Sequence, residues 1–262
     1  MFVTLMYHLV DDRISHPMSV PQDRFERQIT WLAASGARLL TADQADGLLD
    51  TPVPDSSSPD TPLPDTPLPD TLECGRGSSS DAVFVTFDDG YLNTVDTALP
   101  VLRHHGVPAM MAVCGSYLDA ATMPAETPHA SDVFARARDV QRWLDCGYDI
   151  AAHGYRHRKL TDLPEDDLRA EVGLDHAAIT AAFGFAPRSF CYPFGSSNRA
   201  VRSVVGEYYR TAYSTDGGHW PGTGPRLTVR RLQVRPEWSV VDFANALAAA
   251  RQACTRSLER QP

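Results

Sequence analysis

The stretch Val-Phe-Val-Thr-Phe-Asp-Asp-Gly, residues 83 to 90, carries the strongest structural signal in this chain. Five residues that favour a buried β-strand are followed directly by Asp88, Asp89 and Gly90. Asp-Asp-Gly alone is a common surface turn, but the apolar run before it favours a strand end over a hairpin. Because neighbouring side chains leaving a strand point in different directions, the two carboxylates need not share one role.

A second motif, His153-Gly-Tyr-Arg-His157, follows a strand expected at Asp149–Ala152. Histidines four residues apart lie on one face of a helical turn, within reach of one ion. Isolated pairs of this kind are usually incidental, but this pair follows a strand end, as the carboxylates do. Two imidazoles and one carboxylate form a three-ligand site with open positions, which is typical of a catalytic metal centre and not of a closed structural one.

Strand and helix signals alternate along the chain. Strands are expected at Phe2–Met6, Arg38–Leu40, Val83–Phe87, Ala109–Val113, Asp149–Ala152, Ser189–Tyr192 and Thr211–Tyr213, with another near Leu232. Helices are expected around Thr94–His105, Val133–Cys146, Glu165–Phe183, Ala200–Tyr208 and Val240–Cys254, and an earlier one carries Phe25, Ile29 and Leu32 on one face. This alternation predicts an α/β fold with a parallel sheet, open or closed into a barrel. In barrels, catalytic groups gather where strands end.

A short helix is expected after the strand Arg38–Leu40, because Thr41-Ala-Asp-Gln44 has the pattern of a capping box. The next segment, residues 51–80, differs in composition: Thr-Pro-Val-Pro-Asp at 51 is echoed by Thr-Pro-Leu-Pro-Asp at 61 and 66. Such a segment buries too little surface to offset its ordering entropy, so we expect a disordered or polyproline-like insertion. A Pro-rich recognition site for a partner is the alternative.

Composition and charge narrow the function class. The 262 residues suffice for one large domain or two small ones. The net charge is −9 and no basic patch stands out, so nucleic acid is not expected as a partner. The five cysteines are odd in number and lack a CxxC spacing, which favours reduced thiols over a disulfide framework.

The N-terminal sequence Met-Phe-Val-Thr-Leu-Met-Tyr-His lacks the basic start and the apolar length of a signal peptide. No run approaches the roughly 18 apolar residues that a membrane span requires, so no transmembrane segment is expected. We therefore expect a cytoplasmic location.

Two further elements bear on catalysis. The sequence Phe-Cys-Tyr-Pro-Phe-Gly, residues 190 to 195, breaks a strand with Pro and Gly, and backbone N–H groups freed there can face a developing oxyanion. An ordinary strand exit with core aromatics is the alternative. His8 stands at the end of the first expected strand, which makes it a candidate acid for protonating a leaving nitrogen.

Taken together, the motifs resemble a known family. Thr86-Phe-Asp-Asp-Gly90, His153-Gly-Tyr-Arg-His157 and the Tyr-Pro-Phe-Gly exit resemble the polysaccharide deacetylases of carbohydrate esterase family 4, also called nodulation-factor-deacetylase-like domains. Met6-Tyr-His8 and Arg230-Arg-Leu232 look like the subgroup that de-N-acetylates surface poly-N-acetylglucosamine. The resemblance covers residues 1–250 apart from the insertion.

The resemblance implies a distorted (β/α)₇ barrel forming a single domain over residues 1–262, and one divalent metal ion. Zinc is the expected metal, with cobalt, nickel or iron as alternatives. By resemblance Asp88 is the general base, and Asp89, His153 and His157 are the metal ligands. The resemblance thus assigns a different role to each aspartate, whereas their spacing alone leaves the two roles open.

The sequence departs from the family pattern at two places. Many members carry Arg-Pro-Pro-Tyr-Gly in the third motif, whereas Cys191 and Tyr192 stand at its first two positions here, and Arg231 is the candidate replacement for the missing guanidinium. The late Leu-x-x-His acid motif is also absent. We favour His8 as the acid over His219, the last histidine of the chain. Tyr192 and Phe194 are the expected substrate and oxyanion residues.

The expected activity is removal of N-acetyl groups from an amino-sugar glycan, or from a lipid-linked sugar intermediate. Two alternatives remain on the same scaffold. One is a hydrolase of ureide- or imide-like small molecules, because a fold does not fix a substrate. The other is a glycan-binding homologue without turnover, against which the retained aspartates and histidines of the first two motifs argue.

Overall fold

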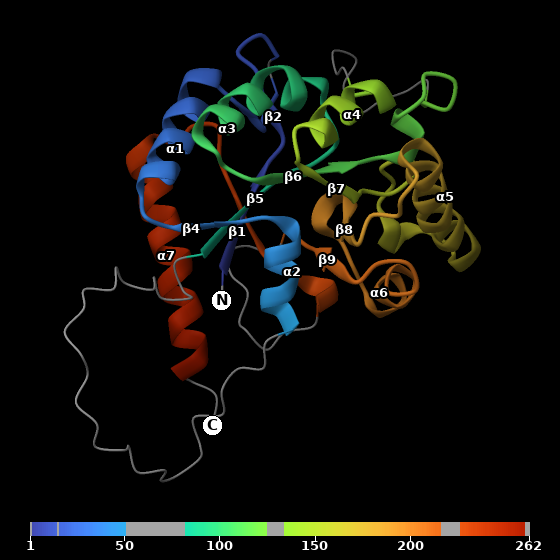
Figure 1. Cartoon of the computed structure of the whole chain (residues 1–262). Helices are drawn as coiled ribbons and strands as arrows, with labels where there is room; N and C mark the ends of the chain where they lie inside the picture. Colours follow the sequence, from blue (N-terminus) through green and yellow to red (C-terminus); the bar gives the residue numbers. More distant parts are fainter. Residues whose placement is uncertain (1, 15, 51–81, 125–133, 216–225, 260–262) are drawn as a thin grey trace, which may run out of the picture.

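The structure, a computed structural model, describes residues 2–14, 16–50, 82–124, 134–215 and 226–259, and parallel strands form its centre (Figure 1). The strands are β1 (Phe2–Tyr7), β2 (Leu9–Val10), β3 (Ser19–Val20), β4 (Arg38–Leu40), β5 (Ala82–Phe87), β6 (Ala109–Val113), β7 (Asp149–Ala152), β8 (Ser189–Cys191), β9 (Thr211–Tyr213) and β10 (Arg231–Gln233). The α-helices are α1 (Gln22–Ala34), α2 (Ala42–Asp50), α3 (Leu99–His105), α4 (Ala137–Asp145), α5 (Glu165–Phe183), α6 (Arg199–Val205) and α7 (Val240–Glu259).

The main sheet runs in the order β10-β1-β5-β6-β7-β8-β9, and each neighbouring pair is parallel. Strand β4 pairs with the first half of β5, beside the position where β6 pairs with the second half. The sheet nearly closes on itself, because Val229 bridges Tyr213 of β9 just before β10 pairs with β1. The result is the single-domain α/β fold of a distorted (β/α)₇ barrel, as the family resemblance implied.

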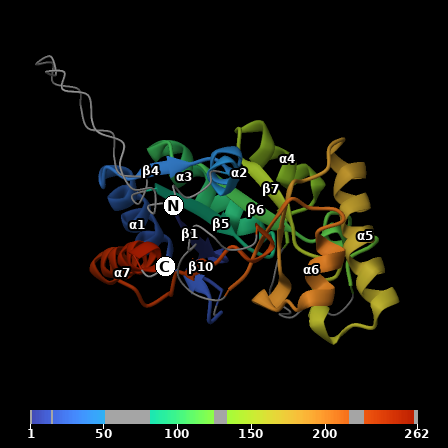
Figure 2. The same cartoon turned by 90° about the horizontal axis from the view of Figure 1, so that it is seen from below.

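Alternating strand residues face two separate apolar layers, as the two-residue period of a strand requires. Val83, Val85 and Phe87 of β5 belong to the layer between the strands and the surrounding helices, whereas Phe84 belongs to the smaller layer with Ala151 and Tyr213. Figure 2 shows the helices arranged around the strands. The α1 face expected from Phe25, Ile29 and Leu32 is confirmed, since all three residues are fully buried.

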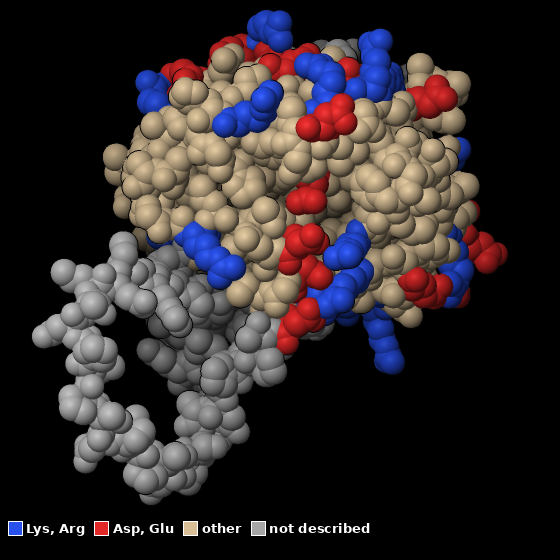
Figure 3. Space-filling model, in the orientation of Figure 1, with Lys and Arg blue, Asp and Glu red and all other residues tan. Residues whose placement is uncertain are grey.

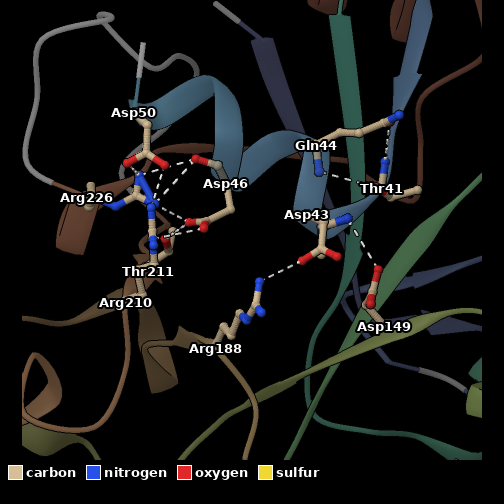
Figure 4. A network of polar contacts seen from close by, with 11 residues as sticks. Thr41, Asp43, Gln44, Asp46, Asp50, Asp149, Arg188, Arg210, Thr211 and Arg226 are labelled. Carbon is tan, nitrogen blue, oxygen red and sulfur yellow. Dashed lines mark hydrogen bonds and ion pairs between the residues drawn. The ribbon is translucent and has the colours of Figure 1, made fainter. Parts of the chain in front are cut away.

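Helix α2 is attached to the amino-terminal ends of β7 and β9. Its predicted capping box is present: Thr41 N donates to Gln44 Oε1 at 3.1 Å, and Gln44 N donates to Thr41 Oγ1 at 3.3 Å. Asp46 accepts a hydrogen bond from Thr211 Oγ1 at 2.6 Å (Figure 4). Asp149 accepts one from the backbone of α2 at Ala42.

Arginine side chains strengthen this attachment, since Asp46 pairs with Arg210 and Arg226, and Asp43 with Arg188 (Figure 4). On this face of the molecule basic and acidic side chains therefore lie next to each other (Figure 3).

Several expected elements have different bounds in the structure. The helix expected from Thr94 begins as a π-helical turn, Thr94–Ala98, and becomes α-helical only at Leu99. Pro100 explains the change, because proline lacks the N–H group that an α-helix interior uses and fits its first turn.

Three other elements are shorter than expected. Helix α4 starts at Ala137, since Phe134 forms an antiparallel bridge with Tyr91. Helix α6 ends at Val205 and strand β8 ends at Cys191.

Some expectations concern residues outside those that the structure describes. These are the insertion at 51–80, His219, Val133 and Cys74. Among the described cysteines, Cys114, Cys146 and Cys191 are free thiols. Over the described ranges, no helix combines the length and apolar character needed to cross a membrane.

Candidate active site

A pocket of about 290 Å³ opens where the strands of the barrel end. It is lined by Met6, His8, His16, Met18, Asp88, Asp89, Tyr91, Tyr117, Phe134, His153, His157, Phe194, Thr215 and Gln233. The aligned ends of β1 and β5 bring His8 and Asp88 to this pocket, and Asp88 N donates to Tyr7 O at 2.9 Å. The structure therefore brings together groups that the sequence places far apart.

Asp88 forms a bidentate ion pair with Arg231. The guanidinium nitrogens Nη1 and Nη2 lie 2.6 Å from Asp88 Oδ1 and Oδ2, respectively. Arg231 is fully buried and also donates to Thr86 Oγ1 and Ser214 O, both at 3.2 Å. Burial alone raises the pKa of Asp88, but the Arg231 charge and hydrogen bonds, together with His153, lower it below its ordinary value. Asp88 is thereby held ionised in a fixed orientation.

Asp89 faces the two histidines. Its Oδ1 lies 3.1 Å from His153 Nε2 and 3.1 Å from His157 Nε2, and one ligand atom from each residue lies within 4.8 Å of the others. Asp89 reaches this position through a left-handed backbone (φ 69°), and Gly90 continues it (φ 68°). A Cβ on Gly90 would lie 3.2 Å from Val113 Cγ1, so glycine is required both for the conformation and for the close approach.

The chemistry of these three residues fits a divalent ion. His153 Nδ1 lies 2.7 Å from Cys191 O and donates its proton there, which leaves the Nε2 lone pair directed at the Asp89 carboxylate. Two acceptor atoms at 3.1 Å need a cation between them. Zinc bonds of about 2.0–2.2 Å place tetrahedral ligand atoms roughly 3.3–3.6 Å apart, close to the distances here.

The electrostatics of His153 agree with that requirement. Burial by itself lowers the pKa of this imidazole, but its hydrogen bond to Asp89 and the charges of Asp88 and Asp89 raise it above the ordinary value. The cluster thus attracts positive charge, either a metal ion or a proton.

The two histidines meet through a loop and not through the helical turn that their spacing suggested, so that expectation was wrong. Residues 153–157 contain no helix, and Gly154 (φ 80°) and His157 (φ 55°) both have left-handed backbones. His157 is in a conformation that non-glycine residues adopt rarely. Contacts outside the loop must therefore hold it in place.

Two carboxylates of α5 supply these contacts, and the sequence analysis missed both. Asp175 Oδ1 and Oδ2 accept hydrogen bonds from Gly115 N at 2.6 Å and Gly154 N at 2.7 Å. Glu171 Oε1 accepts one from Arg156 N at 2.5 Å. Burial raises the pKa of Asp175 to about 7, although both N–H groups work to lower it. The signal that identifies them is a carboxylate at apolar-face positions of an otherwise amphipathic helix.

His8 lines the same pocket and is 8% exposed. Burial lowers its pKa, although the neighbouring charges of Asp89 and Asp88 work in the opposite direction. A lowered pKa makes the imidazolium a stronger acid. The competing candidate, His219, lies outside the described residues.

Tyr192 and Phe194 have different surroundings. The Tyr192 side chain is fully buried, its hydroxyl donates to Leu227 O at 2.9 Å, and its N–H donates to Tyr213 O at 3.0 Å. Other backbone carbonyls therefore occupy both the hydroxyl and the N–H group of Tyr192, and the expectation that it contacts substrate or an oxyanion is not met. Phe194, in contrast, lines the pocket, is 62% exposed, and has a left-handed backbone (φ 59°).

An aromatic wall, formed by Tyr91, Tyr117 and Phe134, lines another part of the pocket. Tyr91 stacks on Phe134 with ring centroids 5.0 Å apart, and Tyr117 lies 4.3 Å from the same ring. The sequence analysis missed this wall, because three aromatic residues distant in sequence carry no common pattern.

The sequence model of the family described as Polysaccharide deacetylase matches residues 75–212, just over half of the chain. The chain belongs to the polysaccharide deacetylase family. Members of this family are hydrolases that depend on a metal ion. The cluster of Asp89, His153 and His157 is a possible site for such an ion.

Individual relatives of this polysaccharide deacetylase are distant in sequence. The putative polysaccharide deacetylase YxkH of Bacillus subtilis (strain 168) is 21% identical over 236 residues, which cover 90% of this chain and 72% of that protein. The Streptococcus pyogenes deacetylase PplD, solved in complex with acetate, has a TM-score of 0.74 at 16% identity, covering 94% of this chain and 97% of that one.

A de-N-acetylase from Aggregatibacter actinomycetemcomitans has a TM-score of 0.71 at 19% identity, covering 94% of this chain and 99% of that one. At these identities the two solved structures establish a shared fold.

Proposed function

We propose that this polysaccharide deacetylase is a metal-dependent N-deacetylase that hydrolyses the acetamido group of an amino-sugar glycan or of a glycan precursor. One observation carries the proposal. A carboxylate paired with a buried arginine lies next to a carboxylate that faces two imidazoles, and both open into a pocket that also contains His8. Amide hydrolysis needs these parts: a base, an electrophilic centre and an acid.

Asp89, His153 and His157 would hold the ion. Their donor set of one carboxylate and two imidazoles suits zinc first, with cobalt, nickel or iron as alternatives. When bound, the ion supplies Lewis-acid chemistry: it lowers the pKa of water and polarises a carbonyl. Three protein ligands leave coordination positions open, as a catalytic site requires.

Asp88 acts as the general base in this proposal. Its carboxylate takes one proton from the attacking water while the water oxygen bonds to the acetyl carbon. Arg231 keeps Asp88 ionised and occupies one lone pair on each carboxylate oxygen, which fixes the direction of the remaining ones. The base is therefore oriented before substrate binds.

His8 acts as the acid. When the bond between the acetyl carbon and nitrogen breaks, the nitrogen takes a proton from the His8 imidazolium and leaves as an amine, with acetate as the second product. Its place in the pocket supports this role, and burial lowers the pKa of His8, which makes its imidazolium a stronger acid.

Phe194 is the proposed substrate-contacting residue of the third motif. Its ring lies at the pocket, 4.7 Å from the His157 ring, with most of its surface free. An apolar face of this kind suits the C–H face of a sugar ring, and the Phe194 backbone stays the candidate oxyanion donor.

The proposed substrate is an N-acetylated sugar. The relative from A. actinomycetemcomitans is described as a de-N-acetylase, which supports an N-acetylated substrate here. A cytoplasmic location would favour a lipid-linked sugar intermediate over a finished polymer, and fractionation of cells that produce the full-length protein tests that location. A ureide- or imide-like substrate is the competing small-molecule class.

The deciding experiment measures acetate release. N-acetylglucosamine oligomers, the N-acetylglucosamine monosaccharide, a lipid-linked N-acetylated sugar and an ureide are incubated with metal-free protein, with and without added zinc, cobalt, nickel or iron. We expect acetate from the N-acetylated sugars only with metal, and none after chelation. Hydrolysis of the ureide alone would favour the competing small-molecule class of substrate. Release of acetate without metal would contradict the proposal.

A further inference from the structure

The loop of residues 153–157, called the ligand loop here, has an unfavourable backbone that something must stabilise. Its first and last residues are the two imidazoles of the candidate metal cluster. Between them Gly154 has a φ of 80°, and His157 itself has a φ of 55°. A left-handed non-glycine residue costs on the order of 1–3 kcal/mol and persists only where its surroundings determine it.

Asp175 is well placed to provide that support. It is fully buried on α5, and each carboxylate oxygen accepts one backbone hydrogen bond: Oδ1 from Gly115 at 2.6 Å and Oδ2 from Gly154 at 2.7 Å. Gly115 follows the end of β6, and Gly154 lies between the two histidines. The Asp175 side chain thus connects the segment after β6 to the ligand loop, which follows the neighbouring strand β7.

The fit at Gly115 is tight. A Cβ built there would lie 2.9 Å from Asp175 Oδ1 and 3.0 Å from Ala178 Cβ, distances that force a neighbour to move. Glycine at this position therefore permits the carboxylate to approach the backbone.

Glu171, one helical turn before Asp175, also accepts a backbone hydrogen bond from the ligand loop, but only one. It is 3% exposed, and its Oε1 accepts from Arg156 N at 2.5 Å, also within the ligand loop. The two carboxylates share the buried side of α5 with Leu168, Val172 and Ile179. Burying a carboxylate among apolar side chains costs free energy unless the carboxylate makes strong hydrogen bonds. Packing alone therefore does not explain why carboxylates occupy these two positions.

We infer that Asp175, assisted by Glu171, is a positioning residue for the metal centre. The two side chains bind the backbone N–H groups of the ligand loop and fix it in the conformation that directs both imidazoles at Asp89. This inference rests on the proposed function insofar as it takes the Asp89 cluster to be a metal site. Asp175 and Glu171 themselves act through the loop.

The arrangement makes an unusual prediction for two conservative substitutions. Asp175→Asn replaces one acceptor oxygen by an N–H donor, so one of the two backbone N–H groups faces a donor and the bond is lost. Glu171→Gln keeps the one oxygen that the loop uses. The same change of carboxylate to amide should therefore damage the site at Asp175 and leave it largely intact at Glu171.

The test measures zinc affinity by competition with a chromophoric chelator, and the visible spectrum of the cobalt-substituted protein. We expect Asp175→Asn to weaken zinc binding by about 10- to 100-fold, the range typical of groups that orient metal ligands, and to alter the cobalt bands. Glu171→Gln should stay within a few-fold of the unmodified protein, whereas Glu171→Ala should lose affinity. Glu171→Gln removes the charge but keeps the hydrogen-bond acceptor. Retained zinc affinity in this variant therefore shows that the hydrogen bond to the loop matters and not the charge.

A destabilised control excludes a general effect of unfolding. Thr211→Val removes the hydrogen bond to Asp46 at the opposite end of the barrel. It should lower the melting temperature without changing zinc affinity. If Thr211→Val weakened zinc binding as much as Asp175→Asn, or if Asp175→Asn bound zinc normally, the inference would be wrong.

Two further outcomes are also decisive. If Asp175→Asn does not fold, the contrast between Glu171→Ala and Glu171→Gln decides, and equal zinc affinities in those two variants would overturn the inference. If the unmodified protein itself binds no divalent metal, the proposed function fails, and that result is distinguishable because it does not depend on any variant.

Discussion

Arg231 and Asp88 form a buried bidentate pair across 143 residues of sequence, with both nitrogen–oxygen distances at 2.6 Å. The same guanidinium lies 3.4 Å from the sulfur of Cys191. By the family resemblance, Cys191 stands at the position where many members carry an arginine. Arg231 of β10 thus reaches both Asp88, at the end of β5, and Cys191 of β8.

The first prediction concerns this pair. Arg231→Met should lower the free energy of unfolding by about 3–5 kcal/mol, because it leaves a buried carboxylate unpaired. It should also raise the pKa of Asp88, since the arginine charge is a main cause that lowers it. The base must be ionised, so the acid limb of the kcat–pH profile should move to higher pH. Arg230→Met, at an exposed neighbour, is the control in urea unfolding and pH-dependent kinetics.

The second prediction separates the two aspartates. Asp88→Asn should retain bound metal but lose most turnover, about 10²-fold or more, because an amide cannot accept the proton of water. Asp89→Asn should lose metal. Elemental analysis of both dialysed variants, together with acetate release, provides the comparison. The opposite pattern would mean that the two roles must be exchanged.

The third prediction concerns His157. His157→Ala should lose bound metal and activity together, because two remaining protein ligands hold an ion poorly. His104→Ala, which removes an exposed histidine of α3 away from the pocket, should change neither. Metal content and kcat/KM are measured on the same preparations. Full metal occupancy in His157→Ala would remove this residue from the ligand set.

The fourth prediction concerns the acid. His8→Ala should depress turnover of amides much more than turnover of aryl acetate esters, because an aryl oxide leaves without protonation and an amine does not. We expect a difference of roughly 10²-fold between the two substrate types, within the usual range for general acid catalysis. Equal losses on both would show that His8 does not protonate the leaving group.

The fifth prediction concerns Phe194. Because its exposed ring lies at the pocket, Phe194→Ala should raise KM for a glycan substrate roughly 5- to 30-fold, which corresponds to about 1–2 kcal/mol of lost contact. kcat should change less, since the backbone stays in place. Phe185→Ala, at another exposed phenylalanine outside the pocket, is the control. An unchanged KM would exclude a substrate contact by the ring.

Some of this structure follows from local sequence because local patterns have local physical causes. The apolar run before Asp88 becomes the buried strand β5, and the reciprocal bonds of Thr41 and Gln44 start α2 where the pattern predicted. The spacing of Phe25 and Ile29 selects the buried face of α1. In each case residues within one or two turns, or on alternating sides of one strand, determine the outcome.

Other features depend on which distant segments meet, and sequence periodicity carries no information about that. The placing of β10 beside β1, and of β1 beside β5, brings Arg231 to Asp88. A loop held by α5, and not a helical turn, directs His153 and His157 at Asp89.

The sequence by itself therefore determined the residue types at the strand ends: the two carboxylates, the two imidazoles and the early histidine. The tertiary structure alone decided their partners, because strand order and register set the distances between side chains far apart in the chain. It turned Tyr192 into the core, where its hydroxyl bonds to Leu227, and left Phe194 at the pocket. Tyr192 and Phe194 are two residues apart, but the chain turns after β8 ends at Cys191, so one side chain enters the core and the other reaches the pocket.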